Sequence, residues 1–320
     1  MTALHPERPG CIRPVADVAL TATIQHSAPM KSMRPLGMVA AILLCGMHAS
    51  AGQSNPALQP GDTYEITMTR ETSQRSGNAS SGSSHDRDTL IERVIGLRLD
   101  GIEFEYDLPP GVTKQQRTAQ WQFPVRVLRP FHGPMQLLNR PELEARVEAW
   151  LKAANWTRDV CGHWIFTWNA FQIDCDPESV IEKIEAFDLS VPDVREGGTY
   201  RDKLALNPGP LVEAATGPEG ASFTASMQID PDAVRRERAQ GDVVVGEILR
   251  EPITLEKALA NRKKETVSGA IFVTLQSDPA GNVWRRNKVI NTEIRNADGQ
   301  LEANTINETM EKRLVSQQPL

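Results

Sequence analysis

Hydrophobic residues alternate with polar ones in several parts of the chain, which is the two-residue period of strands that bury one face. The first case is residues 62–70, where Tyr64, Ile66 and Met68 occupy every second position. Comparable segments follow later in the chain, at residues 95–106, 221–229, 270–276, 283–295 and 301–314. We expect two antiparallel meanders that join in one curved sheet.

A tight turn is indicated at Asp100-Gly101, inside one of these segments. Asp-Gly is a favoured pair for a two-residue hairpin turn. Pairing outward from it places Leu99 opposite Ile102 on an apolar face and Arg98 opposite Glu103 on the solvent face. The turn and the alternation together predict a hairpin in this register.

Residues 73–86 differ from their surroundings because they are rich in serine and glycine and nearly free of apolar side chains. Such a segment buries too little apolar surface to offset the entropy lost on ordering. We therefore predict a flexible loop here.

Helical spacing of apolar residues appears in the middle of the chain. It predicts helices over residues 139–155 and 176–188, the first with Asn139 as its cap. Residues 231–263 are ambiguous, since helix-like runs surround the β-branched Val243–Val245.

Two cysteines flank a predicted hairpin whose register is open. A two-residue turn leaves Cys175 opposite Trp164, whereas a three-residue loop at residues 167–169 places Cys161 directly opposite Cys175. Directly opposed strand residues have Cα atoms about 4.5–5.5 Å apart, which a disulfide accepts. We predict the second register and a Cys161–Cys175 bond, formed in an oxidising compartment.

These elements predict an α+β fold, mostly antiparallel β meanders forming a curved sheet, with a two-helix plus disulfide-hairpin insert. Within a mature globular region at 52–320, we expect a β meander at 52–108, a helical and disulfide-bearing insert at 109–192 and a mainly β part at 193–320.

The N-terminal part has the pattern of a cleavable secretory signal. Two basic residues precede an uncharged apolar run, Leu36–Met47, and the small residues Ala49–Ala51 follow. A membrane anchor is the alternative, but the run is shorter than the about 20 residues that span a bilayer. We predict an upstream extension at 1–29, a signal peptide at 30–51 cleaved near Ala51, no integral membrane segment afterwards, and a periplasmic or extracellular location.

Composition and motifs narrow the function without identifying it. The net charge is −6 and no basic patch is present, which argues against nucleic acid as a partner. We find no serine-hydrolase elbow and no phosphate-binding glycine loop. The histidines after residue 51 are isolated, at His85, His132 and His163. We therefore predict no catalytic residue, no metal site and no cofactor.

Aromatic residues gather around the predicted disulfide hairpin. Most of them should build a local core, because large aromatics bury much area. The alternative is that some line a groove for an apolar ligand or a partner protein. Our candidates for that role are Trp168 at the hairpin tip, Trp164 and Phe166; the wider cluster adds Trp150, Trp156 and Phe171.

Three function classes remain open. The first is a non-catalytic, exported envelope protein that binds a lipid-like ligand or a partner protein, so that the partner is an envelope protein or an apolar small molecule. The second is a structural or assembly component acting through surface contacts. The third is an enzyme whose site is assembled from distant residues. We favour the first, because strands are abundant and no catalytic motif is found.

Overall fold

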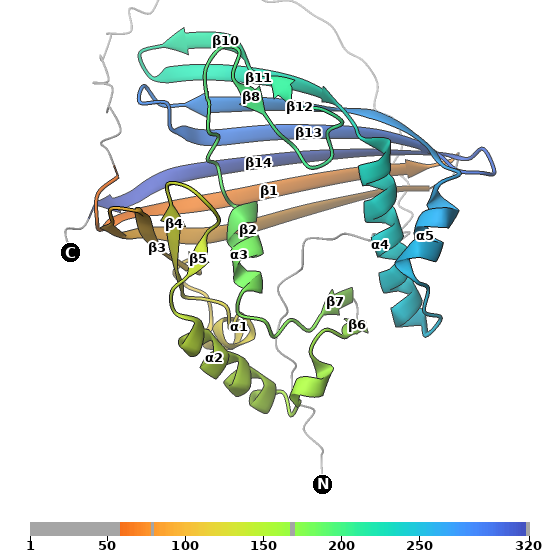
Figure 1. Ribbon diagram of the computed structural model, residues 1–320, viewed down its shortest axis with the longest axis horizontal. Coiled ribbons are helices and arrows are strands. Elements are labelled where there is room, and N and C mark those ends of the chain that lie inside the picture. The colour runs from red at the N-terminus through yellow and green to blue at the C-terminus, as the bar shows by residue number, and fades with distance from the viewer. Residues whose placement is uncertain (1–57, 78–79, 167–169, 318–320) are drawn as a thin grey trace, which may run out of the picture.

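The computed structural model describes residues 58–77, 80–166 and 170–317 of the 320-residue chain. Its main element is a ten-stranded open antiparallel sheet with the strand order β10-β11-β12-β13-β14-β1-β2-β3-β4-β5 (Figure 1). The strands are β1 (Asp62–Ser76), β2 (Ser80–Leu97), β3 (Gly101–Asp107), β4 (Val125–Pro130), β5 (Gln136–Leu137), β10 (Val212–Gly217), β11 (Gly220–Gln228), β12 (Thr266–Ser277), β13 (Val283–Arg295) and β14 (Leu301–Gln317). The predicted α+β fold is confirmed.

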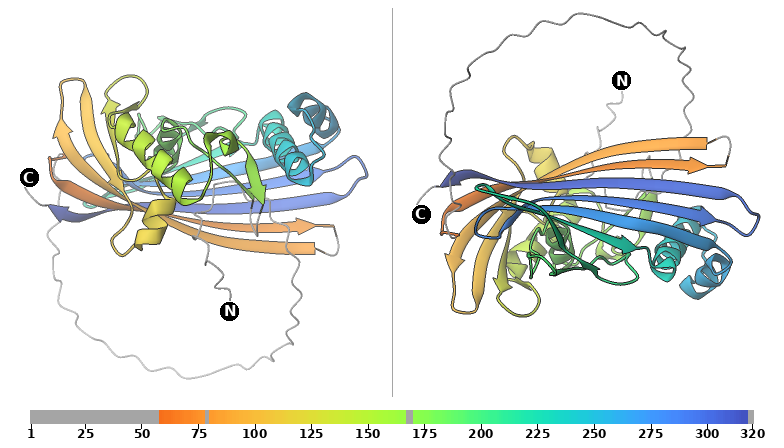
Figure 2. Two further views of the ribbon diagram at one scale, coloured as in Figure 1. Left: turned by 90° about the horizontal axis from the view of Figure 1, so that it is seen from below. Right: turned by 90° about the horizontal axis from the view of Figure 1, so that it is seen from above.

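The first and last strands of the sheet in sequence lie next to each other at its centre. β1 pairs with β14 along its whole length, from Asp62 opposite Gln317 to Ser76 opposite Glu302. The N-terminal and C-terminal meanders therefore form one sheet, which twists across the molecule in both views of Figure 2.

All described helices lie on one face of the sheet, which we call the inner face (Figure 1). They are α1 (Lys114–Ala119), α2 (Arg140–Ala153), η1 (Arg158–Val160), α3 (Ser179–Ala186), α4 (Pro231–Leu249) and α5 (Leu255–Arg262). Two small pairs of strands accompany them, β6 (Trp164–Phe166) with β7 (Ala170–Gln172), and β8 (Thr199–Tyr200) with β9 (Gly209–Pro210). No described helix is long and apolar enough to cross a membrane.

Apolar side chains of the inner face form two separate core clusters. The first joins β1–β4 to α2, α3 and the disulfide, with Phe104, Val147 and Ile184 among its buried members. The second joins β11–β13 to α4 and the β8–β9 pair, with Ile271 and Leu275 fully buried. The apolar positions of the alternating strands are thus buried on the inner face only.

Both predicted helices form, and the ambiguous region is helical. Asn139 precedes α2 as predicted, but its side chain makes no capping hydrogen bond: it accepts from the Arg126 amide and donates to the Glu142 carboxylate. Asp230 caps α4 by accepting a hydrogen bond from the Asp232 amide, and Thr254 caps α5 in the same way. The run Val243–Val245 lies inside α4. Its β-branched residues cost a helix only a few tenths of a kcal/mol each, so capping and tertiary packing outweigh them.

The predicted register of the hairpin at Asp100-Gly101 is wrong. Leu97, and not Leu99, lies opposite Ile102, and the register shifts by one residue beyond this pair. Gly101 is already a strand residue of β3. A Cβ at this position would lie 2.3 Å from the carbonyl oxygen of Arg129 on β4, so only glycine fits here without a shift of the backbone. The turn consequently lies earlier, and Leu99 is fully exposed.

The predicted loop at residues 73–86 is also wrong where the structure describes it. Residues 73–76 continue β1 and residues 80–86 begin β2, and both are paired in the sheet. β14 supplies the backbone partners of residues 73–76, and those hydrogen bonds do not require apolar side chains.

Several predictions fall outside the described residues. These are the upstream extension at 1–29, the signal peptide at 30–51 and the hairpin tip with Trp168. They stay predictions, as does the division of the mature chain at residues 108 and 192.

Candidate functional site

A group of charged side chains separates the two core clusters on the inner face. At its centre is Glu308 on β14, whose side chain is 5% exposed. Its carboxylate oxygens lie 2.8 Å from Arg70 Nη2 on β1, 3.3 Å from Arg286 Nη2 on β13 and 3.6 Å from Lys288 Nζ on β13. We call Arg70, Arg286, Lys288 and Glu308, together with Asp202, the polar belt.

Asp202 connects the polar belt to the segment that follows β8. Its carboxylate lies 3.2 Å from Lys288 Nζ, and its own side chain is 6% exposed. On the other side, Arg286 Nη1 donates a hydrogen bond of 3.2 Å to the carbonyl of Asp188, just beyond α3. The polar belt is thus held both by the sheet and by the helices and connecting segments that cover its inner face, which we call the covering layer.

The cations of the polar belt keep Glu308 ionised. Burial opposes the charge, but Lys288, Arg70 and Arg286 outweigh it and hold the pKa of Glu308 below its usual value. The buried carboxylate is therefore a permanent charge of the folded protein at neutral pH.

Two hydrogen-bond donors of the polar belt have no acceptor. The Nε atoms of Arg70 and Arg286 are buried and without a hydrogen-bond partner. Arg129 and Arg238 carry the only other such Nε atoms among the described residues. Arg70 and Arg286 differ from those two in flanking one carboxylate from both sides, on strands about 10 Å apart. A buried donor without an acceptor is costly, so this place favours an oxygen-bearing group.

The covering layer is arranged around the middle of the strands. α3 and α4 stand apart along the strand direction, and the β6–β7 hairpin lies between them, further from the sheet (Figure 1). Glu247 of α4 joins the hairpin, accepting a hydrogen bond of 3.2 Å from the Trp164 amide and lying 3.7 Å from His163 Nδ1.

Half-buried apolar side chains lie near this contact. Trp164 is half-buried, and so are Val243 and Val244, which lie one helical turn before Glu247 on the same side of α4. In the described part of the chain, none of the three belongs to either core cluster. The middle of the inner face thus combines polar groups on the sheet with apolar groups on the hairpin and α4.

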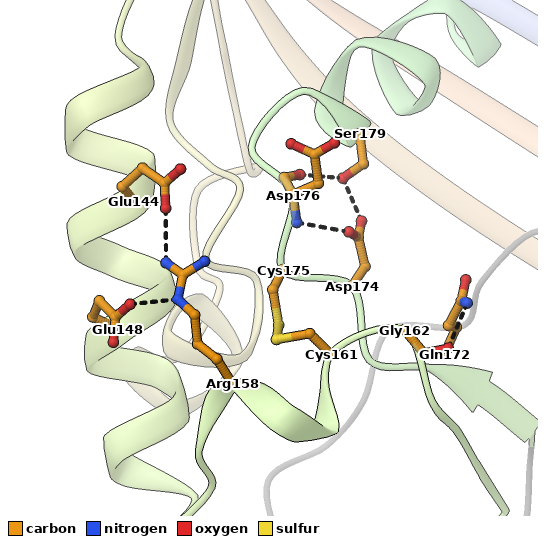
Figure 3. Close-up of a disulfide and its surroundings, with 10 residues drawn as sticks. All are labelled: Glu144, Glu148, Arg158, Cys161, Gly162, Gln172, Asp174, Cys175, Asp176 and Ser179. Atoms are coloured by element: carbon orange, nitrogen blue, oxygen red, sulfur yellow. Dashed lines mark hydrogen bonds and ion pairs between the residues drawn. A yellow bond between two sulfur atoms is a disulfide. The ribbon is translucent and has the colours of Figure 1, made fainter.

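The disulfide hairpin has the predicted register. Trp164 pairs with Gln172, Ile165 with Phe171 and Phe166 with Ala170. Cys161 and Cys175 are bonded, and their Cα atoms are 5.6 Å apart (Figure 3). The predicted bond and its register are confirmed.

Polar contacts attach the disulfide to the neighbouring helices (Figure 3). Arg158 lies 2.8 Å from Glu144 and 2.6 Å from Glu148, both on α2. On the far side of the bond, Asp174 accepts hydrogen bonds from the Asp176 amide and the Ser179 hydroxyl at the start of α3. The base of the hairpin is therefore fixed to α2 and α3.

The predicted aromatic site is only partly described. Trp164 is half-buried and its amide contacts Glu247, while only the backbone of Phe166 is described and Trp168 lies outside the described residues. Trp150 and Trp156 meet edge to face at 5.6 Å and pack against the first core cluster. Those two tryptophans build core.

The isolated histidines do not converge on a site. His85, His132 and His163 are all exposed. Within the ranges that the structure describes, no three His, Cys, Asp or Glu side chains are close enough to hold a metal ion.

A second buried network lies inside the first core cluster. Glu92 is 1% exposed; it accepts hydrogen bonds of 2.7 Å from the Tyr106 hydroxyl and 2.5 Å from Lys312 Nζ. Arg129 donates to the Tyr106 oxygen and lies over the Phe104 ring. Burial, followed by the charge of Glu92, raises the pKa of Tyr106, so the phenol stays protonated and donates.

Sequence reasoning missed both networks, although a signal existed. Arg70 continues the spacing of Tyr64, Ile66 and Met68, and Glu308 precedes Met310 at the same two-residue interval. A charged residue in phase with the apolar face of a strand must be paired or functional, because an unpaired buried charge is costly.

Comparison with known proteins gives no family. No family model matches the chain, and no curated protein matches it. Among solved structures, one described as "lipid-protein interactions in lipovitellin" resembles this fold distantly, with a TM-score of 0.39 and 7% identity over 82% of this chain and 26% of that chain. This chain thus spans about a quarter of the lipovitellin chain. Ail, the attachment invasion locus protein of Yersinia pestis, aligns with a TM-score of 0.17 and 4% identity over 79% of this chain and 99% of that chain. Neither likeness carries an argument about function.

Proposed function

We propose that this protein is a non-catalytic binding protein of the cell envelope, which holds a lipid-like molecule on the inner face of its sheet between α3 and α4. The observation that carries the proposal is the pair of buried Nε donors on Arg70 and Arg286. An oxygen of the ligand's polar end would accept from them, and its apolar part would lie against Trp164, Val243 and Val244.

The charges of the polar belt limit the polar end of the ligand. Arg70, Arg286 and Lys288 are balanced in part by Glu308 and Asp202, which leaves one positive charge. Asp86 and Asp88 lie on the same face of β2, opposite Arg70 and Met68, and add negative charge at the edge of the polar belt. This favours a polar end that offers oxygen acceptors and carries no more than one negative charge, such as a carboxylic acid or an ester.

Binding of a lipid probe tests the proposal. Protein purified from its native envelope is extracted and analysed for lipids by mass spectrometry, and the delipidated protein is titrated with a dansyl-labelled fatty acid. We expect a lipid in the extract and saturable probe binding. Arg70→Gln should weaken probe binding at least about tenfold, since hydrogen bonds to charged groups contribute about 1.5–3 kcal/mol.

The matched control is Arg75→Gln on the same strand, which is exposed on the outer side. It should bind the probe as the wild type does. Absence of both lipid and probe binding, or equal binding by Arg70→Gln in a folded protein, would contradict the proposal. Co-purification of a stoichiometric protein without lipid would favour the partner-binding alternative.

Export is the second part of the proposal. The signal pattern over residues 30–51 supports it, and so does a disulfide, which persists in oxidising compartments. N-terminal sequencing of protein from the periplasm or the medium should give Gly52 as the first residue. An intact segment 30–51 on folded, exported protein would refute cleavage.

A further inference from the structure

The outer face of the sheet carries a block of positions without any charge. The block spans three rows across β11–β14, and strand pairing places its members side by side. The rows are Thr224, Thr274, Asn287 and Thr309; Ser226, Phe272, Val289 and Asn307; and Gln228, Ala270, Asn291 and Thr305. All of them are exposed or half-buried, and the described helices lie on the opposite face (Figure 1).

The lack of charge is unusual for a protein surface. Since roughly 25–35% of well-behaved surface positions are charged, a block of this size would be expected to contain about three or four charged residues. Charges resume directly outside it, in the ion pair of Arg285 with Glu311 and at Glu71 on β1, which lies opposite Asn307. The charge-free area is therefore bounded and lies at the middle of the strands.

Hydrogen bonds between side chains orient the polar groups of the block. Asn287 donates 2.9 Å hydrogen bonds to Asn307 Oδ1 and to the Thr309 hydroxyl, and the Thr305 hydroxyl donates one of 2.9 Å to Asn291 Oδ1. These bonds use one end of each amide. This leaves three groups that can form hydrogen bonds with a ligand: the amino groups of Asn307 and Asn291 and the carbonyl oxygen of Asn287.

An apolar pair stands in the centre of this arrangement. Phe272 is 48% exposed and lies opposite Val289, with Asn307 on the next strand. By strand geometry, Asn287 and Asn291 lie about 7 Å to either side of Val289. The block thus has an exposed aromatic side chain surrounded by fixed amides and hydroxyls.

We propose that this outer face binds a neutral glycan. Sugar rings present apolar C–H faces and hydroxyl edges, which match an aromatic side chain flanked by amides. The block spans about 14 Å by 13 Å from the strand spacings, enough for a short run of sugar rings. The site is independent of the lipid-like ligand, because it lies on the opposite face.

Other partners fit the block less well. Nucleic acid needs cations, and the block contains none. The residues that contribute most binding energy at protein interfaces are tryptophan, tyrosine and arginine, and the block contains none of these; its one aromatic residue is Phe272. A neutral polyhydroxylated partner needs no charge, and a single aromatic side chain can stack on the C–H face of a sugar ring.

Saturation-transfer NMR with neutral oligosaccharides tests the proposal on the full mature protein. The probes are the tetramers of N-acetylglucosamine, of β-1,4-linked glucose and of α-1,4-linked glucose. We expect at least one to bind, and Phe272→Ala to weaken its affinity about fivefold or more. The matched control is Phe131→Ala, since Phe131 is also an exposed phenylalanine (61%) but lies outside the block.

The melting temperature of Phe272→Ala is measured alongside, because an exposed side chain on a paired strand should change it little. Asn291→Ala is the second variant and should also weaken binding. Failure of all three probes to bind at millimolar concentration, or wild-type binding by both Phe272→Ala and Asn291→Ala, would overturn the proposal. Loss of binding in Phe131→Ala would overturn it as well. Arg70→Gln should leave glycan binding unchanged, so this test and that of the lipid-like ligand can fail separately.

Discussion

The two sides of the inner face are stabilised in different ways. The side of the first core cluster begins with the long strands β1 and β2 but ends at the sheet edge in short ones, with 7 residues in β3, 6 in β4 and 2 in β5. This side carries the disulfide and the Glu92 network. The side of the second cluster contains strands of 9, 12 and 13 residues and is covered by α4 and α5. Longer strands share more backbone hydrogen bonds and more cross-strand contacts.

The difference shows what short strands need. A two-residue strand contributes little pairing, so the first side depends on a covalent bond and on buried polar contacts. The second side depends on pairing and on apolar packing of residues such as Ile271 and Leu275. The polar belt lies between the two sides and is shared by them.

Removing a charge from the first side should have the largest effect on stability. Glu92→Gln leaves Lys312 without its buried counter-charge, and breaking such a pair costs about 3–5 kcal/mol. Denaturant unfolding measures the loss. Glu65→Gln is the control, because it removes the partner of Arg313, the neighbour of Lys312 on β14, on the solvent side of the sheet, where the cost should be below about 1 kcal/mol. Equal losses would show that burial does not distinguish the two pairs.

Removing the disulfide should have the next largest effect. The double variant Cys161→Ser, Cys175→Ser opens a loop with a sequence separation of 14, which on the chain-entropy estimate costs about 3 kcal/mol. Hydrogen exchange should show faster exchange in α2 and α3, while the amides of β12 and β13 keep their protection. Equal loss of protection on both sides would mean that the two clusters unfold as one unit.

The polar belt should make stability depend on acidic pH. Because the pKa of Glu308 is lowered in the folded state, its contribution is complete above the usual value of 4.5 and is lost as the pH falls through the lower folded-state value. Glu308→Gln should cost about 1–3 kcal/mol at neutral pH. Its deficit relative to the wild type should shrink as the pH falls below 4.5. A constant deficit across that range, measured by unfolding at several pH values, would contradict this role.

The contact between the hairpin and α4 should have the smallest effect. Glu247→Ala removes a partly exposed acceptor of the Trp164 amide, so the loss of stability should be below about 1 kcal/mol. Thermal unfolding measures this loss, and binding of the fatty acid probe to the same variant should weaken if the hairpin helps to hold the ligand. A large loss of stability would show that the hairpin is part of the core.

Local patterns were sufficient for much of the fold. The alternation from Tyr64 to Met68, the helix that begins after Asn139 and the hairpin between Cys161 and Cys175 involve residues close in sequence, and short-range geometry decides them. The disulfide was predictable because only one of two registers brings the sulfurs within bonding distance.

Only the tertiary structure decided the remaining features, because they depend on contacts between residues far apart in sequence. The loop expected at residues 73–86 is strand where it is described, since β14, more than 200 residues away, supplies backbone partners. The turn lies before Gly101, and not at Asp100-Gly101 as predicted, because the backbone of β4 lies close to Gly101. Arg70 and Glu308 are 238 positions apart, and their pairing exists only once β1 and β14 meet. Short-range patterns in the sequence determined most of the strands and helices; the free energy of long-range pairing determined the remaining strand residues and which charges could be buried together.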